Sequence, residues 1–346
     1  MSWDEIKGHD EVVEDFRRAI NRNRLASSFL LVGPASIGKR MFALQLAQTL
    51  LCGKVDITEM APCGICEDCQ QVKAQTHPDL LVVQRPKDRT RIPIELLIGE
   101  GKNRMREGLC HDISLRPYRG RRKVAIIDDA DYLNQEGANC LLKTLEEPPS
   151  DSVIILISES QQRQLPTIRS RCQIIRFAPL PESIVAELLL AQGVTEDPQT
   201  AHAIAARGKG SLRQATQLAD EGLEDFREVL LKTLAKADFG SVQLAKDAWD
   251  FVQKSADDAP QRRQAIGYLI QFALDYYRAE LHLLSGSDPS QIEGLAAGRH
   301  AGGIDGMIAC LDRCIEAEMQ LDSNANLASL IEGWIDDLAT ASRTGI

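Results

Sequence analysis

The chain has 346 residues, a length that predicts two or three domains, and its 44% hydrophobic and 26% charged residues are typical of a soluble globular protein. No apolar run approaches the roughly 20 residues that a membrane-spanning helix needs, and the acidic start lacks the pattern of a secretory signal, so we expect a cytoplasmic protein without membrane partners. The net charge of −10 argues against a protein that holds DNA by itself, because such proteins present a basic surface, but not against a subunit whose partners supply positive charge.

The first 178 residues predict strands that alternate with helices. Short apolar runs lie at 29–32, 80–83, 124–127 and 153–157, another candidate strand lies at 173–177, and helical spacing follows the first run at 41–51. Runs that are apolar throughout suit the buried strands of a parallel sheet covered by helices on both faces. We therefore expect an α/β domain over residues 1–178.

A glycine-rich turn follows the first of these runs and opens a helix. It carries Gly33, Gly38 and Lys39 in the pattern G-x-x-x-x-G-K. This pattern predicts a P-loop, in which backbone N–H groups at a helix N-terminus face a phosphate and the lysine reaches the β- and γ-phosphates. Arg40 stands where a serine or threonine would ligate Mg²⁺, and a guanidinium cannot ligate a cation. We expect ATP or ADP to bind, but not efficient Mg²⁺-assisted hydrolysis.

Four of the nine cysteines lie close together in the chain, at Cys52, Cys63, Cys66 and Cys69. In a reducing cytosol such a cluster indicates a metal site rather than disulfide bonds. Four thiolates suit tetrahedral Zn²⁺, and since they fill all four positions on the ion, we expect the zinc to be structural. An iron–sulfur cluster stays open as an alternative. We interpret His77, which follows soon after, as a structural residue in a turn.

The apolar run at 124–127 ends in two carboxylates, Asp128 and Asp129. In P-loop ATPases the first acid at this place helps to hold Mg²⁺, and a glutamate after it polarises the attacking water. Asp128 suits the first role. Asp129 is one methylene shorter than the glutamate, which also argues against fast hydrolysis.

Arg171 lies in the segment 165–173, between the last two predicted strands. Its planar and permanently charged guanidinium suits a γ-phosphate, and an arginine from a neighbouring subunit can stabilise the transition state of phosphoryl transfer. Judged by its chemistry alone, a surface salt bridge is the favoured role for this residue.

No strand is expected after Pro179. Short helices are predicted at 182–192, 198–207 and 211–220, and longer ones at 223–236, 241–255, 259–284, 303–321 and 325–341. We therefore expect a small helical domain at 179–222 and a larger helical domain at 223–346.

Four blocks of the chain match one protein family. They are GPASIGK with the cysteine cluster and HPDLLVV after it, KVAIID with NCLLKTLEEPP, LPTIRSRCQ, and NANL at 324–327. The set resembles the clamp-loader branch of the AAA+ family, and within it the delta-prime subunits of the bacterial replicative DNA polymerase. The matches run from residue 8 to beyond residue 330.

The resemblance implies a P-loop AAA+ domain with a parallel sheet and a zinc-binding insertion, a small helical lid domain, and a C-terminal helical collar that joins subunits. Members of the family assemble with gamma/tau-like motor subunits and a delta-like subunit into a hetero-pentamer. This assembly opens the ring-shaped sliding clamp and places it on primer–template DNA during DNA replication. The chain is then a stator whose own ATPase activity is weak or absent, inside a complex that acts as a DNA-directed DNA polymerase.

The resemblance also assigns roles to individual residues. It makes Arg171 an arginine finger that reaches the ATP site of the adjacent motor subunit. Ser158 stands at the sensor-1 position, and Arg213, in the segment 210–213, stands at the sensor-2 position, where it would touch a bound nucleotide.

Two other functions stay open. One is an active gamma/tau-like ATPase subunit of the same complex, which Arg40 and Asp129 disfavour. The other is a zinc-dependent scaffold without a nucleotide, which Lys39 disfavours. One stretch departs from the family: the chain between His77 and Lys123 is longer than expected, with 99–106 as added sequence. It belongs to a local basic region at 85–123, which is either a solvated loop, the favoured interpretation, or a surface for DNA or an acidic partner.

Overall fold

The computed structural model describes residues 3–86, 89, 91–119, 121–219, 221–236, 238–256, 258–284, 302–322 and 325–344. Contacts divide the chain into two compact units, Met1–Gln217 and Leu218–Ile346. Asn324, the first residue of the NANL block, lies outside the described residues.

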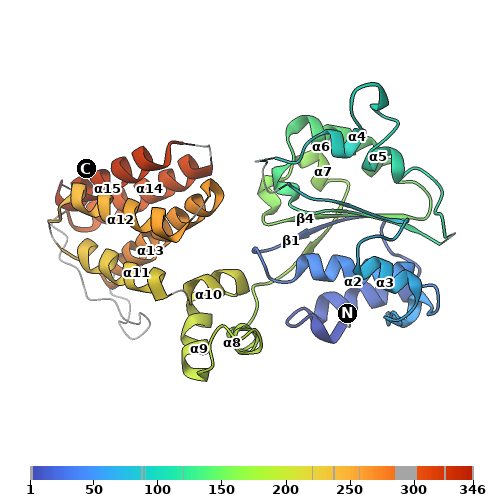
Figure 1. Ribbon diagram of the computed structural model, residues 1–346, viewed down its shortest axis with the longest axis horizontal. Helices are drawn as coiled ribbons and strands as arrows, with labels where there is room; N and C mark the ends of the chain where they lie inside the picture. The colour runs from blue at the N-terminus through green and yellow to red at the C-terminus, as the bar shows by residue number, and fades with distance from the viewer. Residues whose placement is uncertain are drawn as a thin grey trace. The chain divides into compact units, whose positions relative to one another are not determined.

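The first unit is built around a five-stranded parallel sheet with the strand order β2-β3-β4-β1-β5 (Figure 1). The strands are β1 (Ser28–Val32), β2 (Leu80–Val83), β3 (Lys123–Ile127), β4 (Ser152–Ser158) and β5 (Gln173–Arg176). Every residue of β1, β3 and β4 is buried, as expected of central strands that are apolar along most of their length. The five predicted strands are confirmed.

Helices cover both faces of this sheet. In Figure 1, α2 (Lys39–Leu51) and α3 (Glu67–Lys73) lie on one side, and α4 (Glu95–Ile98), α5 (Leu109–Asp112), α6 (Gln135–Glu146) and α7 (Pro166–Arg169) lie on the other. Alternate residues of each strand pack against the helices on opposite faces of the sheet, because successive side chains point to opposite faces. Leu30 joins a core cluster with Leu97 of α4 and Leu141 of α6. Its neighbour Phe29 packs on Phe16, whose ring in turn contacts Phe42 of α2.

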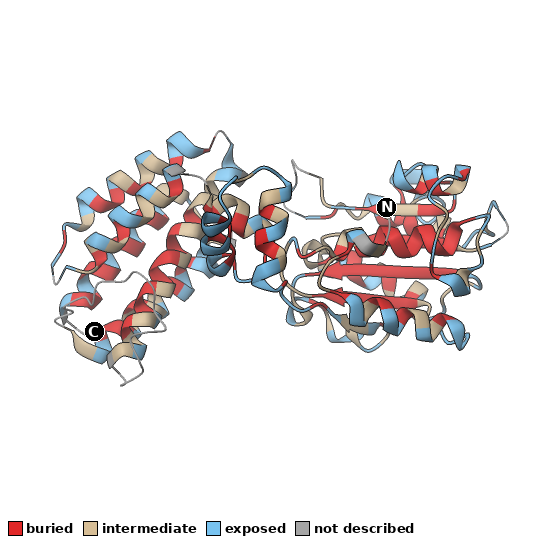
Figure 2. Ribbon diagram, turned by 90° about the horizontal axis from the view of Figure 1, so that it is seen from below, coloured by how far each residue is buried: buried red, intermediate tan, exposed pale blue. Residues whose placement is uncertain are grey.

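The remaining elements of this unit are short or peripheral. The helix α1 (Asp10–Asn21) precedes β1, and single 3-10 turns lie at η1 (Trp3–Glu5), η2 (Ile57–Glu59), η3 (Gly101–Asn103), η4 (Ala130–Tyr132) and η5 (Gln161–Arg163). Figure 2 shows the buried strands enclosed by helices whose outer faces are exposed.

Three helices follow the sheet, α8 (Glu182–Ala191), α9 (Pro198–Arg207) and α10 (Leu212–Leu218). Gly210, just before α10, has a φ of 79°, and a Cβ there would lie 2.5 Å from the Cβ of Pro179. Its carbonyl accepts a hydrogen bond of 3.0 Å from the N–H of Leu180. The start of α10 is thus fixed to the segment that leaves the sheet. The boundary at residue 178 between a P-loop domain and a lid stays a prediction, because the contacts group α8 to α10 with the sheet.

The second unit consists of helices in its described part. They are α11 (Glu221–Leu234), α12 (Ser241–Ser255), α13 (Ala259–Leu284), α14 (Gly303–Asp322) and α15 (Leu327–Thr344). α14 packs against both α13 and α15, and α12 packs against α15. Trp334 of α15 is fully buried, and its indole N–H donates to the Sγ of Cys314 at 3.4 Å. The predicted fold class, α/β followed by all-α, is confirmed. Within the described residues, none of the helices combines the length and the apolar character needed to cross a bilayer.

Candidate functional site

The loop between β1 and α2 is held tightly against its surroundings. Gly33 has a φ of 154°, and a Cβ there would lie 2.4 Å from the carbonyl oxygen of Phe177. Only glycine allows the two backbones to approach this closely. Gly38, with a φ of 100°, is the N-cap of α2. The buried His9 ring holds the loop from outside, with a ring nitrogen 2.7 Å from the carbonyl oxygen of Ile37.

A cavity of about 780 Å³ lies beside this loop. Its volume is in the range of small-molecule binding sites. The ends of β3 and β4 and parts of α8 and α10 complete its wall, with apolar surface from Leu180, Leu188 and Leu212. It brings together seven of the eight residues predicted for nucleotide binding, namely Gly38, Lys39, Arg40, Asp128, Asp129, Ser158 and Arg213. Gly33 supports the loop but is not part of the lining.

Lys39 closes the loop upon itself. Its Nζ donates to the carbonyl oxygen of Gly33 at 2.6 Å and also to that of Pro34, and the residue is buried. Burial lowers the pKa of Lys39 from its ordinary value, and the nearby carboxylates of Glu159 and Asp131 act in the opposite direction. The ammonium group therefore lies where it can exchange a loop carbonyl for a phosphate oxygen.

Both carboxylates at the end of β3 have an arginine beside them. The Nε of Arg40 lies 3.4 Å from the Oδ2 of Asp128, and its terminal nitrogen donates to the Oε1 of Gln75 at 3.1 Å. The Nε of Arg85 lies 3.9 Å from the Oδ2 of Asp129. Burial, and then the charge of Asp128, raise the pKa of Asp129, whereas Arg85 opposes this rise.

This donor set does not fit Mg²⁺. The ion demands near-octahedral coordination by oxygen ligands. Arg40 stands in place of a hydroxyl residue and carries no acceptor atom. Its positively charged guanidinium contacts the carboxylate of Asp128. The prediction that the metal is poorly accommodated therefore has a geometric basis.

Asp131, which was not among the residues predicted from the sequence, lines the cavity and fixes two of its neighbours there. The hydroxyl of Ser158 donates to its Oδ1 at 2.7 Å, and the N–H of Glu159 donates to its Oδ2 at 2.6 Å. Gln164 adds a longer contact of 3.5 Å between its Nε2 and the same Oδ1. The position of Asp131, two residues after Asp129, was the available signal. Glu159 lines the cavity too, and its place directly after a buried strand could have revealed it.

The start of α10 reaches the loop through Ser211. Its hydroxyl donates to the carbonyl oxygen of Ala35 at 2.9 Å. This contact joins two segments that are far apart in the sequence, and it sets the first turn of α10 beside the cavity. Arg213, in that turn, forms part of the lining.

Arg171 is not part of this cavity's lining. It follows α7, and its side chain is 31% exposed. Its guanidinium is ion-paired with the carboxylate of Glu146, the last residue of α6, and donates to the carbonyl oxygen of Thr167 at 2.8 Å. The residues predicted for nucleotide binding and Arg171 thus lie at two different sites on the same unit.

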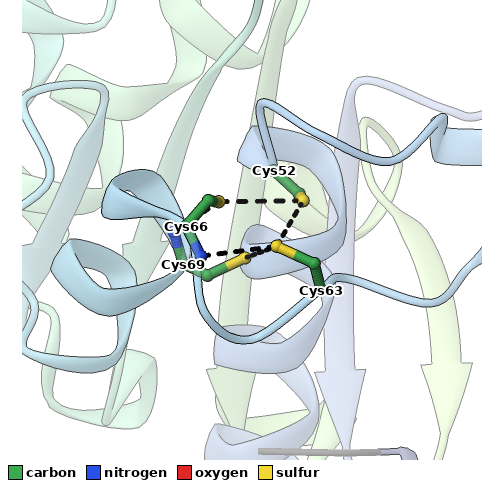
Figure 3. A group of neighbouring side chains, drawn as sticks. All are labelled: Cys52, Cys63, Cys66 and Cys69. Carbon is green, nitrogen blue, oxygen red and sulfur yellow. Dashed lines mark hydrogen bonds between the residues drawn. The ribbon is translucent and has the colours of Figure 1, made fainter.

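The four clustered cysteines come together in space (Figure 3). Cys52 lies 3.8 Å from Cys63 and 4.0 Å from Cys66 between Sγ atoms, and Cys63 lies 3.9 Å from Cys69. All four sulfurs lie within 4.8 Å of one another. Zinc–sulfur bonds of about 2.3 Å in a tetrahedron give sulfur–sulfur distances of about 3.8 Å. The geometry fits a tetrahedral ion held by these four residues.

The surroundings act differently on the individual thiols, since backbone N–H groups favour the thiolate of Cys63 whereas burial raises the pKa of Cys69. Cys52 is the C-cap of α2 and Cys66 is the N-cap of α3, so two helix ends position them. The N–H groups of Cys66 and Cys69 point at the sulfurs of Cys63 and Cys66, each at 3.4 Å. Backbone N–H groups of Ile65 and then Cys66 lower the pKa of Cys63 to about 6.

His77 lies outside the sulfur cluster and is buried. Its Nδ1 accepts from the N–H of Asp79 at 3.0 Å, and its Nε2 lies 3.4 Å from the Oδ1 of Asp68. It fixes the turn before β2, as expected of a structural residue.

Much of the basic region makes contacts within the chain. Arg104 pairs with Glu136 at 2.8 Å, Arg119 pairs with Glu67 at 2.9 Å, and Arg121 donates to the carbonyl oxygen of Gly53 at 2.9 Å. The last two contacts bind the region to the cysteine cluster's surroundings. Lys87 and Gly120 lie outside the described residues.

Comparison with known proteins adds the family. Residues 8–181 match the model of the family described as DNA polymerase III, delta subunit. The DNA polymerase III subunit delta' of Pseudomonas aeruginosa is 34% identical over 235 residues, which cover 67% of this chain and 68% of that protein. The corresponding Bacillus subtilis subunit is 33% identical over 56% of this chain and 55% of its own length.

A second group of relatives is more distant. The DNA polymerase III subunit tau of Escherichia coli is 28% identical over 64% of this chain and 33% of its own length. Among the solved structures, a DNA polymerase III gamma subunit-related protein from Thermotoga maritima matches this chain with a TM-score of 0.40 and 17% identity over 96% of this chain and 99% of that one. The family model covers half of the chain and the Pseudomonas relative two thirds of it, and on this basis the chain belongs to the delta-prime family of DNA polymerase III clamp-loader subunits.

Proposed function

We propose that this chain is the stator of a clamp loader, which lends Arg171 to the ATP site of an adjacent gamma/tau-like subunit. The assembly, a hetero-pentamer completed by a delta-like subunit, opens a sliding clamp and places it on primer–template DNA. The helical domain at 223–346, which lies within the second unit, acts as the collar that joins the subunits.

The observation that supports this proposal is that Arg171 lies outside the cavity that holds the P-loop residues of the same chain. Its own cavity has Arg40 against Asp128, which disfavours Mg²⁺ and hence hydrolysis. Arg171 lies outside that cavity and is accessible, with 31% of its side chain exposed. An arginine finger acts in trans when its guanidinium reaches a neighbour's γ-phosphate. A subunit with an impaired site of its own and an accessible arginine suits that division of labour.

The Cys52–Cys69 segment contributes structure rather than chemistry. Four thiolates leave no open position on a tetrahedral zinc ion, so the metal would hold the end of α2 to the start of α3. The cavity would bind ATP or ADP, with Lys39 at the phosphates and Arg213 beside them.

The function is tested by reconstitution. The chain is combined with the gamma/tau-type and delta-type subunits and the clamp from the same organism, and clamp loading on primed DNA is followed. We expect loading to require this chain, while the purified chain alone hydrolyses no ATP above background. Brisk turnover by the chain alone would favour the second candidate, an active motor subunit, and equal loading without the chain would refute the proposal.

A further inference from the structure

The Arg40 side chain lines the cavity next to Asp128. It is the second residue of α2 and directly follows Lys39, the first residue of that helix. Its guanidinium touches Asp128 and donates to Gln75, so that β3 and the chain after α3 both hold it in place. With 40% of its side chain exposed, it keeps surface available for a ligand in the cavity.

The charges around this group resemble those around a bound divalent cation. In a P-loop ATPase, Mg²⁺ joins the acid at the strand end to the β- and γ-phosphates and neutralises them. Here a fixed cation already neutralises Asp128, and Arg85 lies beside Asp129 while its guanidinium stacks 4.4 Å from the centre of the Tyr132 ring. An ion at Asp128 would meet the positive charge of Arg40 instead of an oxygen ligand.

A guanidinium can also bind phosphate directly. Its planar fork forms paired, charge-assisted hydrogen bonds to phosphate oxygens, and it cannot lose its charge at ordinary pH. Positioned in the first turn of α2 with Lys39, it would present two cations and the helix N-terminus to one phosphate chain.

We propose that Arg40 takes the place of the divalent cation, and that the cavity binds the di- or triphosphate of a nucleotide without Mg²⁺. This inference rests on the proposed nucleotide site, but not on the arginine finger. A nucleotide held in this way is a structural ligand of the stator, since the metal needed for phosphoryl transfer is excluded from the same place.

The test measures binding of ATP and ADP to the purified full-length chain by calorimetry, once with Mg²⁺ and once with EDTA. Wild-type affinity should be at least as high in EDTA as with Mg²⁺, because Mg²⁺ binds the phosphates of the free nucleotide in solution while the cavity takes the metal-free form. Arg40→Thr supplies the missing hydroxyl and removes the cation, so its affinity in EDTA should fall about tenfold or more and recover with Mg²⁺. Recovery with the metal would also show that this variant is folded.

A matched control and a second readout sharpen the test. Arg18→Thr removes an exposed arginine of α1 that pairs with Asp15, and it should bind as the wild type does. Electron paramagnetic resonance with Mn²⁺ as the probe should show metal joining the nucleotide complex of Arg40→Thr but not that of the wild type. The proposal is overturned if wild-type binding requires Mg²⁺, if neither nucleotide binds in either condition, or if Arg40→Thr keeps wild-type affinity in EDTA. None of these outcomes bears on whether Arg171 acts in the assembled complex.

Discussion

The guanidinium of Arg171 is ion-paired with the carboxylate of Glu146, so the proposed finger is held against its own subunit by the last residue of α6. Glu146 is 48% exposed, and surface pairs of this kind contribute about 0–1 kcal/mol. The pair therefore orients the arginine at low cost and can open when a neighbour's triphosphate competes for it.

Glu146→Gln tests this holding contact. Removing the carboxylate frees Arg171, so we expect ATP hydrolysis by the reconstituted complex to stay equal or rise, by no more than about fivefold for a pair worth about 1 kcal/mol. The unfolding free energy of the isolated chain should change by less than about 1 kcal/mol. A loss of hydrolysis as large as that caused by removing Arg171 itself would mean that Glu146 belongs to the productive geometry.

The cysteine cluster predicts one zinc per chain. Cys66→Ser removes a ligand at the start of α3, and we expect zinc content measured by mass spectrometry to fall well below that of the wild type, with a lower melting temperature. Cys140→Ser, a partly buried cysteine outside the cluster, is the control and should keep its zinc. Iron with visible absorption in the wild type would establish the iron–sulfur alternative instead.

Two glycine-to-alanine substitutions should change the free energy of unfolding in opposite directions. Gly33→Ala puts a Cβ 2.4 Å from the carbonyl oxygen of Phe177, and we expect a loss of about 2–4 kcal/mol because backbone must shift. Gly333→Ala meets nothing within 4 Å in the middle of α15, where alanine should add about 0.5–1 kcal/mol. Urea unfolding of the isolated chain measures both, and a stable Gly33→Ala would contradict the close approach.

The buried carboxylate of Asp79 holds the basic region in place. It accepts the N–H groups of Tyr118 at 2.6 Å and Arg119 at 2.9 Å. Asp79→Ala leaves both donors unpaired, and we expect a loss of about 2–4 kcal/mol in urea unfolding. The control Asp15→Ala removes an exposed carboxylate on α1 and should change stability by less than about 1 kcal/mol. Equal effects of the two substitutions would rule out this role for Asp79.

The strands and most helices follow from local patterns. The β4 segment, for example, is apolar at every position from Val153 to Ile157, and such a run has few alternatives to a buried central strand. The metal site could be predicted equally well from the cysteines, because their spacing already brings four thiolates within reach of one ion.

The contacts that decide the cavity's chemistry could not be predicted in the same way. The identity of Arg40 showed that Mg²⁺ lacks its hydroxyl, but only the fold brings its guanidinium to Asp128, 88 positions further along the sequence. Arg85 was grouped with a basic region from its charge, whereas the structure sets it beside Asp129 and over Tyr132. Such pairings depend on how strands and loops meet, which periodicity does not encode.

The most direct test of the stator function is the first turnover of ATP by the reconstituted complex, measured by rapid quench. Arg171→Ala in this chain should remove the burst contributed by one ATP site and leave the others, since a finger accounts for about 10³-fold or more of the rate at the site that it serves. Arg176→Ala, an exposed arginine of β5, is the matched control and should keep the full burst. A full burst from Arg171→Ala, with the complex intact by gel filtration, would contradict the account.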